Sequence, residues 1–389
     1  MDKNKRGKPQ FSGEKSGTTL KDSCVLIMGQ SPSSNSYNTS GDGLPFYQGN
    51  ADFGEENPIP RSWCTEPKKI AEKGDILISV RAPIGAINIA DEKCCIGRGV
   101  AAIRPNQEVM SPDFLQHQLF ASRNKLEAMG TGSTFKAIGK KTLSDFPVVI
   151  YPKNTQEAIA QQLNSIKKQI KTANSQLDQL DALVKSRFIE MFKGYARGGN
   201  TVALSELCEF VTVGIANAAT HAYADDGIVM LRNLNVRENY LDDSDLIKIN
   251  PDFAAKYSKK TLKAGDILVA RTGYPGIACV VPEKYAGCQT FTTLIARLKS
   301  NAQIIPLFLS FWINSPAGKE FVEHMKAGSS QQNFGATSLK LLEVPLPPLS
   351  LQQEFAAFVA QVDKLRFKTQ QQIEKLEMLK ESLMQEYFG

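Results

Sequence analysis

The sequence predicts an α+β protein in which two globular domains with bent, mostly antiparallel sheets are joined by two long antiparallel helices. Three observations predict it. Two long stretches carry apolar residues at heptad spacing. The chain repeats itself at a nearly constant offset. Each half also contains many short apolar runs separated by Gly, Pro, Asn and Asp, which is typical of short strands joined by turns. Together these features predict an internal duplication with a pseudo-two-fold axis.

Residues 155–192 are predicted to form one long helix. Apolar residues recur there in alternating steps of four and three, at Ile159, Leu163, Ile166, Ile170, Ala173, Leu177, Leu180 and Val184. Neither Gly nor Pro interrupts the stretch. At about 1.5 Å per residue the helix would be about 55 Å long. A helix of that length with one apolar seam needs an equally long partner.

Residues 351–388 supply that partner, because they match the first stretch without a gap at an offset of 196 residues. At this offset Gln156 falls on Gln352, Ile159 on Phe355 and Phe192 on Phe388. The expected seam of this second helix contains Phe355, Val359, Val362, Ile373 and Leu376. Arg366, Thr369 and Lys380 occupy further seam positions. An oligomeric coiled coil is one alternative, but two copies in one chain favour an intramolecular antiparallel pair.

The repeat extends upstream of the helices, which makes it a duplication of whole domains. Gly139 falls on Gly335 at the same offset, and Arg104 falls on Arg297 at an offset of 193 residues. The predicted boundaries are a flexible tail at 1–16, a first globular domain at 17–153, a central helix and linker at 154–199, a second globular domain at 200–348, and a distal helix at 349–389. Each globular domain also contains helical signals, at 111–130 and at 305–328, that begin near Pro and end before Gly.

Composition limits the possible functions only loosely. The net charge of +6 and pI near 8.8 are compatible with a polyanionic partner, but proteins without one share such values. The seven cysteines form no C-x-x-C pair, which favours reduced core residues. No apolar run approaches the length of a membrane span, so a cytoplasmic protein without a membrane partner is expected. The lysine-rich tail suggests either a frayed terminus or weak phosphate contacts.

No catalytic residue or metal site is predicted. His117, His221 and His324 are scattered, and neither a G-x-S-x-G nor an H-E-x-x-H motif occurs. The [ND]-P-P-[FYW] signature of an adenine methyltransferase is also absent. Residues 132–142 resemble a phosphate-binding loop, but their spacing is wrong and the second copy, GSSQQNFGATS, lacks both lysines. What the copies share suits either contact with the phosphates of a duplex or a plain turn.

Several loops are crowded with side chains that could read base edges or hold phosphates. Arginine with guanine and Asn or Gln with adenine are the usual bidentate pairs. The candidates in the first domain are Ser33, Asn35, Tyr37, Gln48, Asn50, Arg61, Arg81, Ser133, Thr134 and Lys136. Those in the second are Thr220, Tyr223, Arg232, Asn233, Arg271, Thr272, Tyr274, Ser329, Ser330, Gln331 and Gln332. Any one of them could instead be an ordinary solvated loop residue.

A contrast within the chain favours recognition. The strands and helices match between the halves, whereas the loops differ, as Arg81-Ala-Pro-Ile-Gly85 and Arg271-Thr-Gly-Tyr-Pro-Gly276 illustrate. One frame carrying two different sets of loops is what two readers of different sequences would need.

These features resemble the specificity (S) subunit of type I restriction-modification enzymes. The motifs that carry the resemblance are LKDSCVLIMGQSPSSNSYN with GLPFYQGNADFG, the GDILISVRAPIG and GDILVARTGYPG strands, GTGSTFKAIGKKTL before FPVVIYP, and the helix ends KSRFIEMF and KESLMQEYF. The resemblance covers essentially everything after the first sixteen residues. It implies that the globular domains are target-recognition domains, each reading half of a bipartite site in double-stranded DNA.

The resemblance also implies a subunit without catalysis of its own. Its helices would act as a ruler and as a docking surface for two methyltransferase (M) subunits, with motor-nuclease (R) subunits joining for cleavage. No cofactor is expected on this chain, because S-adenosylmethionine, ATP and Mg²⁺ would belong to those partners. Two other classes remain open: a coiled-coil scaffold with two protein-binding domains, and an enzyme with its site in a domain cleft.

Overall fold

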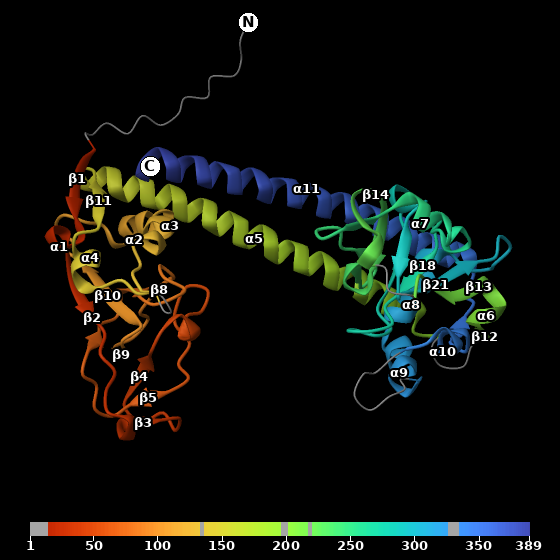
Figure 1. Cartoon of the computed structure of the whole chain (residues 1–389), viewed down its shortest axis with the longest axis horizontal. Helices are drawn as coiled ribbons and strands as arrows, with labels where there is room; N and C mark the ends of the chain where they lie inside the picture. The colour runs from red at the N-terminus through yellow and green to blue at the C-terminus, as the bar shows by residue number, and fades with distance from the viewer. Residues whose placement is uncertain (1–14, 133–135, 196–200, 217–219, 326–333) are drawn as a thin grey trace, which may run out of the picture. The chain divides into compact units, whose positions relative to one another are not determined.

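The computed structural model describes residues 15–132, 136–195, 201–216, 220–325 and 334–389. The chain forms two compact units: unit 1 comprises Met1–Ser175 and Gln370–Gly389, and unit 2 comprises Gln176–Thr369. Two uninterrupted helices, α5 (Lys153–Phe192) and α11 (Leu349–Phe388), each contribute one end to each unit (Figure 1). Both long helices predicted from the heptad pattern are confirmed, and each begins two residues earlier than expected.

Unit 1 consists of short strands and helices packed on the two long helices. Its strands are β1 (Ser16–Thr19), β2 (Cys24–Met28), β3 (Tyr37–Asn38), β4 (Leu44–Tyr47), β5 (Trp63–Cys64), β6 (Ile70–Ala71), β7 (Ile76–Ser79), β8 (Ile87–Ile89), β9 (Cys94–Ile96), β10 (Val100–Pro105) and β11 (Pro147–Ile150). Its short helices are α1 (Leu20–Ser23), α2 (Pro112–Ala121), α3 (Arg123–Ala128) and α4 (Lys140–Ser144).

Two sheets of unit 1 meet at one turn. The four-stranded antiparallel sheet has the order β2-β10-β7-β8, and the five-stranded sheet has the order β3-β5-β4-β9-β6. Strands β4 and β9 are parallel, and the other pairs of the five-stranded sheet are antiparallel. The residues Gly97–Gly99 join β9 to β10 and so connect the sheets. Figure 1 shows the four-stranded sheet nearer to α5 and the five-stranded sheet at the end of unit 1 remote from this helix.

Unit 2 repeats this construction with different outer parts. Its strands are β12 (Thr201–Ala203), β13 (Cys208–Val213), β14 (Tyr223–Arg232), β15 (Val236–Arg237), β16 (Tyr240–Leu241), β17 (Ile247–Ile249), β18 (Ile267–Val269), β19 (Ala278–Val280), β20 (Gln289–Phe291), β21 (Leu294–Leu298) and β22 (Glu343–Pro345). Its short helices are α6 (Leu204–Leu207), α7 (Pro251–Ala255), α8 (Pro306–Asn314), α9 (Pro316–Met325) and α10 (Ala336–Lys340).

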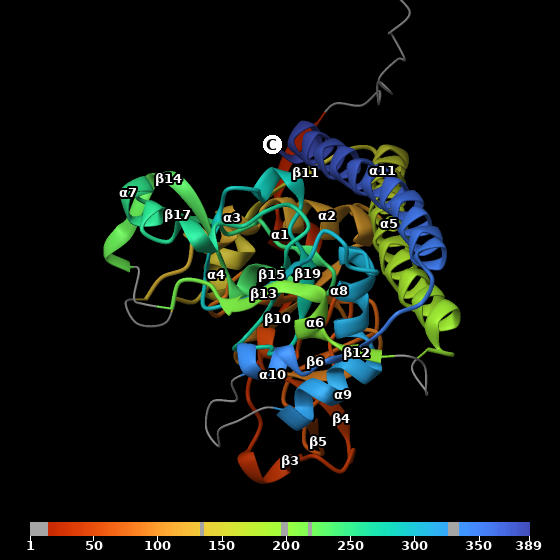
Figure 2. The same ribbon diagram turned by 90° about the vertical axis from the view of Figure 1, so that its right-hand side faces the viewer.

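The inner sheets of the two units have the same order, since β13-β21-β18-β19 corresponds to β2-β10-β7-β8. The outer sheets differ: unit 2 has a three-stranded sheet, β17-β14-β20, in which β14 and β20 are parallel, and a separate β15-β16 pair. Figure 2 shows β14, β17 and α7 on the side of unit 2 away from α5 and α11. The predicted α+β class with mostly antiparallel sheets is confirmed, but each half holds several small sheets.

The two long helices are antiparallel in both units. In unit 2 Arg187 of α5 forms an ion pair with Glu354 of α11 at 3.4 Å, and Asp181 pairs with Arg366. In unit 1 the hydroxyl of Tyr387 donates a 3.0 Å hydrogen bond to Gln162. Residues late in α5 therefore meet residues early in α11, and the reverse holds at the other ends.

The expected seam residues line these contacts but also face the globular cores. Ile159, Leu163 and Ile166 are buried in one core with Phe114 of α2 and Phe388 of α11. The remaining seam residues are buried or half-buried, namely Ile170, Leu177, Leu180, Phe355, Val359, Val362, Ile373 and Leu376. The seam is thus shared with the short helices, because the ends of each long helix form part of a domain core.

Polar residues on the seam have specific partners. The guanidinium of Arg366 pairs with Asp181 across the helices and with Asp363 on its own helix. The ammonium of Lys380 lies 5.0 Å from the centre of the Phe120 ring, and burial lowers the pKa of this lysine. Two of the three interruptions of the apolar pattern, Arg366 and Lys380, therefore make ionic or cation–π contacts.

A buried glutamine fixes the start of each long helix to its globular domain. Gln156 and Gln352 are both fully buried. The amide of Gln156 bonds, at 2.8–2.9 Å, to backbone groups of Ser111, Val109 and Tyr151. The amide of Gln352 makes the equivalent bonds, at 2.8–3.1 Å, to backbone groups of Ile305, Gln303 and Pro347. Each matched glutamine thus satisfies three backbone groups of its globular domain while its own amide is buried.

Two helical stretches predicted as single helices are each broken in two. The first is interrupted at Ser122, between α2 and α3, and the second at Ser315, between α8 and α9. Pro316 explains the second break, because proline offers no N–H to the preceding turn and its ring clashes with that turn.

All seven cysteines are free and buried, as expected, and burial raises the pKa of Cys208 to about 12.

Candidate nucleic-acid interface

Four loops converge in unit 1 where the two sheets meet. The N–H of Gly29, after β2, donates to Val100 at 2.9 Å, and the N–H of Gly97 donates to Tyr47 at 2.8 Å. The N–H of Val80, after β7, donates to Gly99 at 2.9 Å. This convergence follows from the topology, because β10 lies between β2 and β7 and runs antiparallel to both. The ends of β2 and β7 therefore lie beside the start of β10.

Three of the predicted contact residues lie on these converging loops. Gln48 and Arg81 are exposed and directly follow Tyr47 and Val80. Lys136 is also exposed, and its carbonyl accepts a 3.2 Å hydrogen bond from the N–H of Ala82. The structure therefore brings Gln48, Arg81 and Lys136 to one edge of unit 1.

The other candidates of unit 1 lie elsewhere or are engaged within the protein. The hydroxyl of Tyr37 donates a 2.9 Å hydrogen bond to Pro32, and its ring packs 4.7 Å from that of Phe46. Ser33, Asn35 and Arg61 are exposed on the segments next to β3 and β5. Figure 1 shows β3 and β5 at the remote end of the unit. Asn50 is half-buried at the start of the short turn Asn50–Asp52.

One amide joins three loops in unit 2. The side-chain carbonyl of Asn233 accepts a 2.8 Å hydrogen bond from the N–H of Arg271. Its NH₂ group donates to the hydroxyls of Thr272, at 3.1 Å, and Thr292, at 2.8 Å. Both amide hydrogens are therefore used inside the protein. This geometry favours a positioning role for Asn233 and makes Thr272 a partly engaged member of the same cluster.

Thr292 is held in an unfavourable backbone conformation at this junction. Its φ of 58° lies in the left-handed region, which is rare for a β-branched residue. Strained backbone of this kind persists where the surroundings fix it, and it is enriched at functional sites. The hydrogen bond from Asn233 is one of the contacts that hold it.

Arg81 and Arg271 do not occupy equivalent positions in the two turns. The turns close on Ser79 in unit 1, through the N–H of Gly85, and on Ala270 in unit 2, through the N–H of Gly276. These bonds make Ser79 equivalent to Ala270. Arg271 is therefore the equivalent of Val80, and Thr272 is the equivalent of Arg81. Arg271 is accordingly half-buried, and within the described residues its Nε atom is buried without a hydrogen-bond partner.

The remaining candidates of unit 2 are spread along β14. Arg232, at its end, forms a 2.8 Å ion pair with Asp245 and is engaged inside the unit. Thr220 and Tyr223 are exposed at its other end, nine residues or more earlier in the chain. The register of β14 shifts along its length, because Tyr223 and Ile228 both pair with Ile249 of β17.

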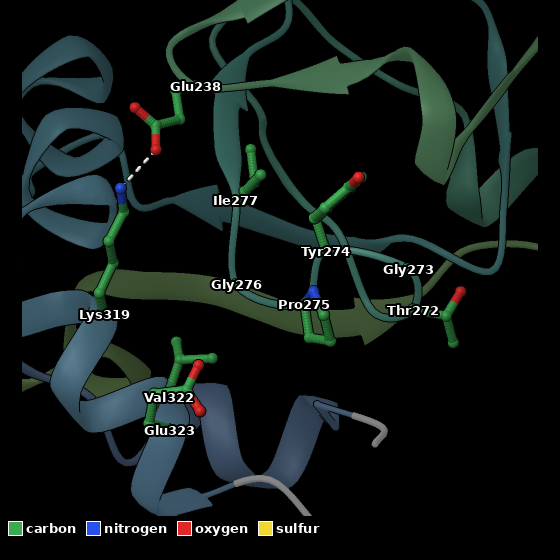
Figure 3. Close-up of a pocket in the computed structure, with 10 residues that line it drawn as sticks. All are labelled: Glu238, Thr272, Gly273, Tyr274, Pro275, Gly276, Ile277, Lys319, Val322 and Glu323. Atoms are coloured by element: carbon green, nitrogen blue, oxygen red, sulfur yellow. Dashed lines mark hydrogen bonds and ion pairs between the residues drawn. The ribbon is translucent and has the colours of Figure 1, made fainter. Parts of the chain in front are cut away.

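The loop 272–277 borders a depression of about 810 Å³ (Figure 3). Lys319, Val322 and Glu323 of α9 line its other side, and Figure 3 shows Tyr274 pointing away from this helix. Tyr274 is 72% exposed, which leaves its ring available for stacking. Glu238, also at the rim, pairs with Lys319 and, at 2.7 Å, with Lys185 of α5. Burial alone would raise the pKa of Glu238, but its bonds to these lysines lower it.

Six predicted contact residues lie outside the described residues: Ser133, Thr134, Ser329, Ser330, Gln331 and Gln332. Within the part of the chain that the structure describes, no group of His, Cys, Asp and Glu could hold a metal ion. The described helices also include none that is long and apolar enough to cross a membrane. One exposed arginine on the converging loops of unit 1, Arg98, was not predicted, although its G-R-G setting is visible in the sequence.

The comparisons with known proteins give the family. A family model described as "Type I restriction modification DNA specificity domain" matches residues 16–182 and again residues 198–378. The chain therefore belongs to the family of type I restriction-modification specificity subunits and carries this domain twice. The two matched segments correspond to the duplication seen in the sequence.

Individual relatives agree with this assignment. A putative type I restriction enzyme MjaX specificity subunit from Methanocaldococcus jannaschii is 43% identical over 160 residues, which cover 41% of this chain and 38% of that protein. The type I restriction enzyme EcoBI specificity subunit from Escherichia coli is 22% identical over 366 residues, covering 85% of this chain and 75% of that protein.

Solved structures share the fold along nearly the whole chain. The S subunit of a type I restriction-modification system from M. genitalium aligns with a TM-score of 0.59 and 14% identity, covering 98% of both chains. A chain from a study of complex assembly and conformational transition of the type I R-M system aligns with a TM-score of 0.63 and 15% identity, covering 96% of this chain and 97% of that one. At such identities the likeness shows the fold alone.

Proposed function

We propose that this chain is the non-catalytic subunit that gives a type I restriction-modification complex its DNA sequence specificity. Each unit would read one half of a bipartite site in double-stranded DNA. The observation that carries the proposal is the contrast between the units: the inner sheets have the same strand order, while the loops at equivalent edges present different side chains. A common frame with different contact groups suits two half-sites of different sequence.

The long helices would hold the two readers at a fixed spacing. Helix α5 is one uninterrupted helix of 40 residues, about 60 Å long at about 1.5 Å per residue. It begins in unit 1, ends in unit 2, and pairs antiparallel with α11 in both. A paired helix resists bending better than a single one, which supports a ruler function.

Methyltransferase subunits would dock on the helices. Leu183 of α5 and Leu379 of α11 occupy equivalent positions of the repeat, and they are 49% and 46% exposed. Two copies of one partner need the same contact twice, which such a duplicated apolar position supplies. S-adenosylmethionine, ATP and Mg²⁺ would be bound by the methyltransferase and motor-nuclease partners. This chain would recognise the DNA sequence on which those partners act.

Insertion of one heptad into both helices tests the ruler. The inserted residues follow Ser175 in α5 and Thr369 in α11, so the antiparallel register is kept. The insertion adds about 10 Å, or about three base pairs of B-DNA. Mapping of methylated adenines in cells that carry the chain with its methyltransferase should show a wider unread spacer between unchanged half-sites. An unchanged spacer would contradict the ruler, and the absence of any sequence-specific methylation would contradict the function itself.

A further inference from the structure

Arg98 occupies the centre of the converging loops in unit 1. It is the only residue with a side chain in the turn Gly97–Gly99, which joins the two sheets. A Cβ atom on Gly99 would lie 2.1 Å from the carbonyl oxygen of Gln48, and one on Gly29 would lie 2.1 Å from that of Gly97. Only glycine allows the loops to approach so closely. The turn is therefore packed backbone against backbone, with one long cationic side chain projecting from it.

Within the described residues the guanidinium of Arg98 makes one hydrogen bond and no ion pair. Its Nε atom donates a 3.3 Å hydrogen bond to the hydroxyl of Ser31, on the loop that follows β2. Within the described residues no carboxylate pairs with it, whereas Arg104 on the following strand is paired with Asp75. Arg98 is exposed, and within the described residues its two terminal NH₂ groups form no hydrogen bond.

The surroundings of Arg98 favour a polyanion. Arg81 and Lys136 are exposed on adjoining loops, and neither forms an ion pair within the described residues. The carboxylate of Asp52, four residues after Gln48, already accepts hydrogen bonds from the N–H groups of Gln48 and Gly49. In the part of the chain that the structure describes, this edge therefore carries three cations without an ion pair, next to the exposed Gln48.

Unit 2 has no counterpart to this arginine. In unit 1 the N–H groups of Gly29 and Gln30 donate to the carbonyls of Val100 and Ile96. In unit 2 the N–H groups of Gly214 and Ile215 donate in the same way to the carbonyls of Thr293 and Thr290. The residues enclosed by these anchors are Gly97, Arg98 and Gly99 in unit 1, and Phe291 and Thr292 in unit 2. This turn therefore carries an arginine in unit 1 but not in unit 2. Such a difference is expected of a residue that helps unit 1 to recognise its own DNA sequence.

We propose that Arg98 is a specificity-determining residue of unit 1, which reads a guanine in its half-site through the two terminal NH₂ groups. This inference rests on the proposed function. Arginine with the O6 and N7 atoms of guanine is the commonest specific contact in the major groove, and it needs a guanidinium whose NH₂ groups are free. The rigid turn and the bond to Ser31 orient the side chain before DNA is bound.

The test compares Arg98→Ala, Arg98→Lys and Lys93→Ala in the complex with the methyltransferase partner, by selection from a pool of random duplexes. Lys93 directly precedes β9, at the opposite end of that strand, and pairs with Glu72 at 3.3 Å, so its removal deletes one positive charge away from the converging loops. Both Arg98 variants should lose roughly tenfold in preference for guanine at one position of one half-site. The other half-site should be unchanged, and Lys93→Ala should keep both preferences.

Three results would overturn the inference. Unchanged preferences would show that Arg98 reads no base. Equal weakening for all sequences, with a salt dependence reduced by about one counterion and restored by lysine, would make it a phosphate contact. Loss of fold in both Arg98 variants, seen as a lowered Tm, would make it structural. A wild-type complex that selects no sequence would instead contradict the proposed function.

Discussion

The guanidinium of Arg104 holds the carboxylate of Asp75 through two hydrogen bonds, of 2.7 and 2.8 Å. The same pair recurs in unit 2 as Arg297 and Asp266, at 2.8 and 2.7 Å. Each aspartate follows a glycine in the left-handed region and is buried, being 3% and 2% exposed. The repeated G-D-I-L motif thus supplies the buried aspartate of an ion pair that joins the two central strands of each inner sheet.

Loss of the arginine should cost more in unit 2 than in unit 1. The side chain of Arg297 is 13% exposed, against 42% for Arg104, so water can replace the lost partner less well in unit 2. We expect Arg297→Ala to lower the free energy of unfolding by about 3–5 kcal/mol, the range for a broken buried pair. Arg104→Ala should cost less, about 1 kcal/mol, because exposure of the arginine screens the interaction. Urea unfolding of both variants measures the difference, and equal losses would contradict the role of burial.

The Glu238 carboxylate should make the stability of unit 2 depend on pH. Its pKa is lowered in the folded state, so its stabilising contribution is present above the unfolded pKa and is lost as the pH falls through the folded pKa. We expect Glu238→Gln to cost about 1 kcal/mol at pH 7 and almost nothing near pH 3, since both lysine partners are more than half exposed.

Urea unfolding between pH 7 and pH 3 measures this dependence. Glu320→Gln is the matched control, because Glu320 is exposed on α9 and its carboxylate has no ion pair in the described part of the chain. A difference between wild type and Glu238→Gln that stays constant over this pH range would show that the lysine pairs do not stabilise the fold.

Asn233 and Arg271 should affect the same half-site in different ways. Asn233→Ala removes three hydrogen bonds that hold neighbouring loops, so it should weaken discrimination at several positions of the half-site read by unit 2. Arg271→Ala should relax roughly one position, because a single bidentate contact is lost. Base preferences from selected duplexes distinguish the two patterns. Equal weakening on all sequences after Arg271→Ala would identify a phosphate contact instead.

The exposed leucines on the helices should each serve one methyltransferase subunit. Leu183→Asp and Leu379→Asp should each remove one of two bound subunits, because a charge placed in an apolar contact is costly to desolvate. The double variant should remove both. Native mass spectrometry of the complex counts the subunits, with Leu341→Asp as control, since Leu341 is 55% exposed but lies beyond α10. Two subunits retained in the double variant would exclude this surface.

Three of the predicted contact residues lie together because their loops follow or face strands that are recognisable in the sequence. Gln48, Arg81 and Lys136 reach one edge because they follow or face the ends of β4 and β7. Arg98 was not predicted because its surroundings depend on four loops that come from distant parts of the sequence.

The sequence by itself determined the duplication, the two long helices and the apolar skeleton of each domain, since heptad spacing and a constant offset are patterns along the chain. The polar positions at Gln156 and Gln352 were equally visible as a match. Tertiary structure decided which loops converge, which side chains are already engaged, and that Asn233 holds loops together. Those properties depend on strand order and on parallel pairs such as β4 with β9, which bring together residues that no local pattern relates.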